Sequence, residues 1–103
     1  MKILQLIYSL APGGAERFVV DLCNDLSVDN KNQVYLVTIN DDSNSVNRHY
    51  LDDLSSKVQY ICLGCKKGLS LESLRKTYMV IRMIKPDIVH AHTKLIMLYL
   101  PSL

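Results

Sequence analysis

The sequence has little net charge, few cysteines and no long apolar run. Twelve basic and ten acidic residues leave a formal charge of +2, and no stretch interleaves basic with aromatic residues as binders of single-stranded nucleic acid do. We therefore expect no nucleic-acid partner. Three cysteines are an odd number, so a disulfide framework is not expected. No apolar run reaches the roughly 18 residues that a membrane-spanning helix needs.

The composition that remains is that of a globular protein. Hydrophobic residues make up 49% of the chain and charged residues 21%, which is enough apolar surface to form a core. A chain of 103 residues is long enough for one domain. The apolar start could be taken for a short signal peptide, but Gln5 interrupts it and no small-residue cleavage site follows before Pro12. We predict a strand there instead.

Four segments have the composition of buried strands. Residues 3–8 form a continuous apolar run, which is typical of a strand covered on both faces in a parallel sheet. Residues 33–39 are rich in strand-forming side chains. Residues 58–63 and 87–91 are shorter runs of the same kind, and Asp87, at the start of the last one, is interpreted as structural.

Amphipathic helices are predicted between these strands. Residues 15–26 repeat apolar side chains with helical spacing. Residues 71–84 do the same, with Ser70 as the predicted N-cap and Lys85-Pro86 as the stop. A short helix is expected over residues 46–54. The predicted buried stripes are Ala15, Phe18, Val19, Leu22, Cys23 and Leu26 in the first helix, and Leu71, Leu74, Tyr78, Ile81 and Ile84 in the later one.

This alternation predicts an α/β fold with a Rossmann-like parallel sheet. Strands that alternate with helices form right-handed βαβ units, and the expected strand order is 3-2-1-4. Ligands of such sheets bind beyond the carboxyl ends of the strands, where the order reverses. Residues 10–17 and 90–94 follow the first and fourth strands, so we expect them to face each other across one crevice.

Gly13 and Gly14 stand where the first strand passes into a helix. The segment A-P-G-G-A-E matches neither the dinucleotide fingerprint nor the P-loop. Glycines at a helix N-terminus nevertheless let backbone N–H groups approach an anion, which the helix dipole favours. The other interpretation is a tight turn. Glu16 fits both, because an acidic first turn stabilises a helix, but its charge would repel a phosphate.

His90 and His92 form a second candidate group. Residues two apart on a strand point to the same side. We predict that His92 lies just past the strand end and turns into the crevice, where it can donate a hydrogen bond to a substrate hydroxyl or act as a general base. We predict that His90 is a buried core histidine with its hydrogen bonds satisfied.

Cys62 and Cys65 form a C-x-x-C pair that, with the two histidines, supplies four zinc ligands by residue type. The predicted order separates the third and fourth strands by three spacings, roughly 14 Å, whereas zinc ligands lie about 2.0–2.3 Å from the ion. We therefore predict no metal site. A redox pair is also disfavoured, because such pairs usually open a helix and this one closes a strand. Lys66 and Lys67 are interpreted as a solvated loop.

Residues 1–26 (MKILQLIYSLAPGGAERFVVDLCNDL) and 81–93 (IRMIKPDIVHAHT) together resemble the retaining glycosyltransferases of family four, which have the two-domain GT-B fold. The segments G-G-A-E-R and H-A-H carry the specificity of this resemblance. The resemblance implies transfer of a sugar from a nucleotide-sugar donor to a cell-envelope glycan or lipid acceptor, with retained configuration and without an obligatory metal or other cofactor.

The resemblance also implies roles for individual residues. The loop that matches Gly13 and Gly14 approaches the donor diphosphate in the family, and the histidine that matches His92 lies beside the transferred sugar as the catalytic-site residue. Glu16 and Arg17 are candidates on the acceptor side. The protein is expected in the cytoplasm or at the inner face of the membrane.

The family's donor-binding domain, with its E-x7-E motif, has no counterpart in residues 1–103. We therefore expect a single partial domain, the N-terminal acceptor-side part of a GT-B enzyme, which is inactive alone and self-associates through the apolar residues 95–100. The alternative is a stand-alone, flavodoxin-like module that binds a phosphate-bearing ligand or a partner protein. A small zinc or redox protein is a third interpretation.

Overall fold

The computed structural model of the chain describes residues 1–10, 13–41, 50–65 and 70–92. Strands and helices alternate along the chain in the predicted order. The elements are β1 (Lys2–Ile7), α1 (Gly14–Ser27), β2 (Gln33–Asn40), a 3₁₀ turn (Leu51–Asp53), β3 (Gln59–Cys65), α2 (Leu71–Ile84) and β4 (Ile88–Ala91). None of the helices in these ranges is long and apolar enough to cross a bilayer.

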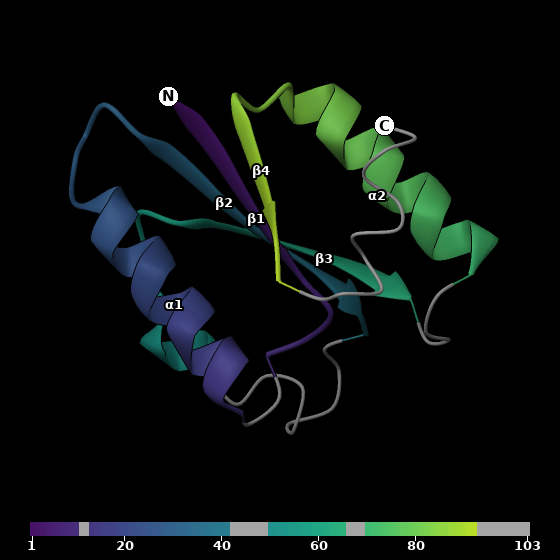
Figure 1. Cartoon of the computed structure of the whole chain (residues 1–103), viewed down its shortest axis with the longest axis horizontal. Helices are drawn as coiled ribbons and strands as arrows, with labels where there is room; N and C mark the ends of the chain where they lie inside the picture. Colours follow the sequence, from purple (N-terminus) through teal and green to yellow (C-terminus); the bar gives the residue numbers. More distant parts are fainter. Residues whose placement is uncertain (11–12, 42–49, 66–69, 93–103) are drawn as a thin grey trace.

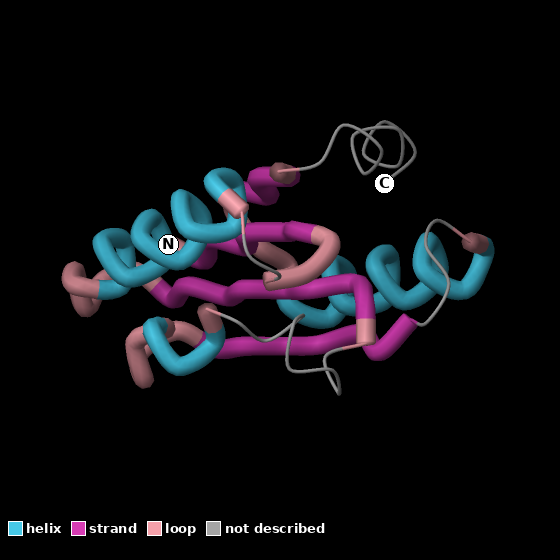
Figure 2. The backbone as a smooth tube through the Cα atoms, turned by 90° about the horizontal axis from the view of Figure 1, so that it is seen from below, coloured by secondary structure: helices cyan, strands magenta, loops and turns pink. Residues whose placement is uncertain are grey.

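The four strands form one parallel sheet in the order β3-β2-β1-β4, which confirms the predicted α/β topology. Figure 2 shows the strands side by side, with β3 and β4 at opposite edges. β1 lies inside the sheet, and its residues Leu4 and Leu6 are fully buried. The apolar run of the first strand, in which Gln5 is the one polar residue, follows from this position, since both of its faces are covered.

The two helices cover opposite faces of the sheet (Figure 1). Successive side chains of a strand point to opposite faces, so β1 and β2 divide their apolar residues between two cores. The core under α1 consists of Ile7, Leu10, Val19, Val20, Cys23, Val34, Leu36 and Val58. The core under α2 consists of Leu4, Leu6, Val37, Ile39 and Cys65, with Val80, Ile81 and Ile84 of the helix packed against it.

The buried face of α2 differs from the predicted one. Leu71 is 86% exposed and Tyr78 is 37% exposed, so the prediction that both are buried was wrong. Ser73 and Thr77 are buried in their place. Two observations explain the rotation of the helix: small side chains let it lie close to the sheet, and the Lys76 ammonium donates to the Leu63 carbonyl of β3 at 3.1 Å.

α1 shows a smaller rotation of the same kind. Its buried residues are Val19, Val20, Cys23 and Ser27. Ala15 is exposed and Phe18 is 57% exposed, so the predicted burial of both was wrong. The rotation places Val20 against the sheet and directs Phe18 toward the edge where β4 lies, since the Phe18 ring contacts His92.

β3 ends at Cys65, two residues beyond the end predicted from the run 58–63, so the predicted end of this strand was wrong. Gly64 has φ 71°, and the pairing with β2 shifts register between Thr38 and Asn40. A glycine in the left-handed region fits a bulge that carries the strand on to Cys65. The predicted loop residues Lys66 and Lys67 lie outside the described residues, as do the self-association segment 95–100 and most of the predicted helix at 46–54.

The ends of α2 follow local rules. Ser70 and Ser73 form a reciprocal capping box, which confirms the predicted N-cap. At the other end Lys85 has φ 52° and ψ 57°, and its N–H donates to the Ile81 carbonyl at 2.9 Å. Pro86 follows and prevents the helix from continuing.

Lys85→Gly is expected to stabilise the protein. A residue with a Cβ in the left-handed region costs about 1–2 kcal/mol, and glycine loses about 0.5–1 kcal/mol more chain entropy on folding, so the expected gain is about 0.5–1 kcal/mol. Urea unfolding followed by circular dichroism measures it. Lys85→Ala removes the same charge but keeps the Cβ, so equal stability of the two variants would contradict the explanation.

Candidate functional site

The candidate site lies at the carboxyl ends of β1 and β4. β4 ends at Ala91, and the His92 N–H still donates to the Leu6 carbonyl at 2.9 Å. His92 therefore lies just past the strand, as predicted, and is held against β1. α1 begins at Gly14, on the chain that leaves β1 at the same edge.

Three elements contribute side chains around the His92 imidazole. Its Nε2 lies 2.5 Å from Oε1 of Gln5 on β1. The Phe18 ring of α1 meets it edge-on with the ring centroids 6.3 Å apart. The His90 ring of β4 lies 4.0 Å away between centroids, tilted by 42°. The site therefore joins residues that are as much as 87 positions apart in the sequence.

Sequence reasoning did not identify Gln5 and Phe18 as site residues. Gln5 is only 2% exposed, and it is the one polar residue in the run from Ile3 to Ile7. An uncharged amide in the middle of a buried strand requires a hydrogen-bond partner, and this was the signal available. No comparable signal marks Phe18, because a phenylalanine in an amphipathic helix is normally a core residue.

The imidazole of His92 is neutral at physiological pH. Burial and, second to it, charge repulsion from the adjacent His90 lower its pKa from 6.5 to about 4. An amide oxygen only accepts hydrogen bonds, so the Nε2 that faces Gln5 carries the proton. The lone pair is then on Nδ1, which makes His92 an acceptor for a hydroxyl group or a ligand for a cation.

His90 is exposed, so the prediction that it is a core histidine was wrong. Its backbone pairs with Gln5, which places the two side chains on the same face of the sheet. β4 is an edge strand, and this face of it is only partly covered, since Ile88 is also 46% exposed. The edge position explains why a residue in an apolar strand remains accessible to solvent.

Gly13 and Gly14 have different surroundings. Gly13 is the N-cap of α1 in an extended conformation, and its carbonyl accepts from the Arg17 N–H at 3.1 Å. A Cβ at Gly13 would collide with the carboxylate of Glu16, whereas a Cβ at Gly14 would meet no atom of the described chain within 4 Å. The Glu16 carboxylate therefore folds back over the helix start, where an acidic group is favoured by the helix dipole.

Arg17 connects α1 to the 3₁₀ turn. Its guanidinium lies 2.9 Å from the Asp53 carboxylate and 3.4 Å from that of Asp21, and it stacks over the Tyr50 ring at 5.7 Å. Asn24 strengthens this connection by donating to the Asp53 carbonyl at 2.9 Å. The structure thus uses the Arg17 charge to hold the turn beside α1, in addition to any contact with a ligand.

The C-x-x-C cysteines lie on the strand farthest from the His92 site. Cys62 and Cys65 are on β3, at the opposite side of the sheet from β4, and the Cys62 thiol donates to the Asn40 carbonyl at 3.2 Å. Burial raises the pKa of Cys65, and it raises that of Cys23 to about 12. Within the described ranges no cluster of three or more His, Cys, Asp or Glu residues is placed to hold a metal ion.

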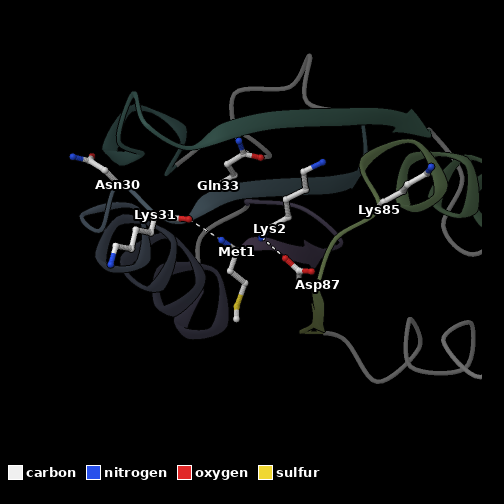
Figure 3. A pocket seen from close by; sticks show the side chains of 7 residues that line it. All are labelled: Met1, Lys2, Asn30, Lys31, Gln33, Lys85 and Asp87. Atoms are coloured by element: carbon white, nitrogen blue, oxygen red, sulfur yellow. Dashed lines mark hydrogen bonds between the residues drawn. The ribbon is translucent and has the colours of Figure 1, made fainter.

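A hollow of about 470 Å³ lies at the other end of the strands (Figure 3). Its polar groups tie the start of β1 to the end of α2 and to the residue before β4: the Lys2 ammonium donates to the Ile84 carbonyl at 3.1 Å, and the Lys2 N–H donates to the Asp87 carboxylate at 2.8 Å. The ammonium groups of Lys31 and Lys85 point away from each other (Figure 3). The hollow therefore has a structural explanation, in agreement with the prediction for Asp87.

Comparison with known protein families, with curated proteins and with solved structures finds no match to this chain. Similar sheets serve many unrelated activities, so the fold alone does not assign one. The assignment has to come from the chemistry of the His92 site and from the sequence segments that surround it.

Proposed function

We propose that this chain forms the acceptor-side part of a retaining GT-B glycosyltransferase of family four, which transfers a sugar from a nucleotide-sugar donor to a cell-envelope glycan or lipid. The observation that carries the proposal is the neutral, half-buried imidazole of His92 at the carboxyl edge of the sheet, with its lone pair on Nδ1. The order β3-β2-β1-β4 supports it, because this is the topology expected for such a domain.

His92 serves in this proposal as the catalytic-site residue that accepts a hydrogen bond from a hydroxyl of the transferred sugar. Gln5 fixes the tautomer and the ring orientation through Nε2. Phe18 forms an apolar wall beside the ring, suited to the C–H face of a sugar. Holding the sugar in one orientation contributes to the rate because the entropy of alignment is lost on binding and not in the reaction.

The first turn of α1 receives the donor diphosphate in this proposal. Gly14 is exposed and its surroundings are open, so the backbone near Gly13 and Gly14 can approach an anion. The Glu16 carboxylate has to move away first, since it lies beside Gly13 and like charges repel. Glu16, once displaced, and Arg17 are the acceptor-side contacts of this proposal.

Amide NMR spectroscopy with nucleotide sugars tests the proposal. Titration of the ¹⁵N-labelled chain with UDP-, GDP- and ADP-sugars is expected to shift the resonances of Gly13, Gly14 and His92. His92→Phe removes the acceptor and should weaken binding by about 2- to 10-fold, since one hydrogen bond contributes about 0.5–1.5 kcal/mol. His90→Phe is the matched control and should bind as the parent chain does.

Two outcomes would contradict the proposal. Shifts of equal size with inorganic pyrophosphate alone, and no dependence on His92, would favour a phosphate-binding module over a sugar site. Transfer of sugar to an acceptor by this chain alone would contradict the assignment of the chain to the acceptor side, for which we expect no turnover.

A further inference from the structure

His90 and His92 together form a second kind of site, because the proposed function uses His92 without His90. Residues two apart on an extended strand project to the same side, and the two rings lie 4.0 Å apart between centroids. His90 is exposed at the edge of the sheet, so solvent reaches this pair directly.

The hydrogen bond between the His92 ring and Gln5 is of the kind that metal-bound histidines make in proteins. Such histidines usually donate their second ring N–H to an oxygen of the protein, which fixes the tautomer and the ring orientation. Here the Nε2–H of His92 donates to Oε1 of Gln5, an amide that is only 2% exposed. The ligand nitrogen that remains, Nδ1, is thereby oriented before any ion binds.

We propose that His90 and His92 chelate one divalent transition-metal ion, with Gln5 as the positioning residue. Two imidazoles at about 2.0–2.1 Å from a shared ion have ring centroids roughly 4.5–5.2 Å apart. The observed separation is 4.0 Å, so the exposed His90 side chain has to rotate outward for both rings to bind one ion. The other coordination positions are open to water, so the ion exchanges readily.

The chemistry of the site selects the class of ion. Imidazole nitrogens suit Zn²⁺, Ni²⁺ and Cu²⁺, whereas Mg²⁺ and Ca²⁺ require oxygen ligands. An ion on Nδ1 of His92 occupies the atom that would accept the sugar hydroxyl, so metal and sugar are expected to exclude each other. This competition rests on the proposed function, but the binding of the ion does not.

Titration of the chain, without an affinity tag, with Ni²⁺ tests the site by calorimetry and by amide NMR spectroscopy. We expect one ion per chain, loss of amide signals around residues 90–92, and no saturable binding of Mg²⁺. His90→Phe and His92→Phe should each weaken binding at least tenfold. Gln5→Leu should weaken it by about tenfold while both ligands remain, since supporting hydrogen bonds affect affinity to that extent.

His49→Gln is the matched control, because His49 is the third histidine of the chain; it should leave binding unchanged. Because His90 is exposed, His90→Phe is expected to fold, and a dispersed amide spectrum confirms this before titration. Absence of saturable Ni²⁺ binding would overturn the proposal. So would binding that survives both histidine substitutions at positions 90 and 92, or binding that is lost only in His49→Gln.

Discussion

Leu6→Ala is expected to lower the free energy of unfolding by about 3 kcal/mol, whereas Leu71→Ala is expected to change it by less than about 0.5 kcal/mol. Leu6 is fully buried in the core under α2, while Leu71 is 86% exposed on the same helix that covers this core. Truncating Leu6 removes apolar contacts and leaves a cavity. Truncating Leu71 removes a side chain that already contacts water, and alanine is at least as good a helix former.

Urea unfolding monitored by circular dichroism measures both variants at one pH and temperature. The pair forms a matched comparison, because the same residue type is shortened by the same atoms. A loss for Leu71→Ala as large as that for Leu6→Ala would show that the outer face of α2 is covered in solution. In that case the sequence-based assignment of the buried stripe would be correct and the rotation of α2 wrong.

Acidification from pH 7.5 to 4.5 is expected to destabilise the protein through His92. The pKa of His92 is about 4 in the folded chain against 6.5 in the unfolded one. Above pH 6.5 neither state binds the proton, so stability does not depend on this group. Below pH 6.5 the unfolded chain binds it and the folded chain does not, so stability falls until pH reaches the folded pKa of about 4.

The size of this effect follows from the shift. One pKa unit corresponds to about 1.4 kcal/mol, and because the ring is partly exposed, solvent screening reduces the full value to about 1–2 kcal/mol. The measurement compares the free energies of unfolding of the parent chain and of His92→Gln from pH 7.5 to 4.5. Both chains have the same carboxylates, so the effect of these groups on stability cancels in the difference. The parent should lose about 1–2 kcal/mol more than the variant.

His90→Gln tests the contribution of His90 to the lowered pKa of His92. Removing the neighbouring imidazole should raise the folded pKa of His92 and so reduce the loss of stability in acid, because charge repulsion from His90 lowers that pKa. Equal acid sensitivity of the parent chain and His92→Gln would mean that the imidazole is as well solvated in the folded chain as in the unfolded one. The lowered pKa of His92 would then have no basis.

Local sequence patterns predicted the order and type of the elements because these depend on nearby residues. The N-cap at Ser70 and the stop at Lys85-Pro86 involve contacts within one helical turn. The position of His92 past the end of β4 follows from strand length and sheet topology. The rotations of α1 and α2 were not predicted, because each helix has more than one apolar face and only the sheet opposite decides which face is buried.

The sequence by itself determined the parallel sheet and the order of its strands, and therefore which segments of the chain follow the carboxyl ends of β1 and β4. Hydrophobic periodicity and the handedness of βαβ connections are enough for that. Only the tertiary structure decided what surrounds His92. Gln5 is hydrogen-bonded to it across 87 positions, His90 is exposed because β4 is an edge strand, and the Glu16 carboxylate lies over Gly13. These contacts depend on how distant residues pack, and no local pattern encodes that packing.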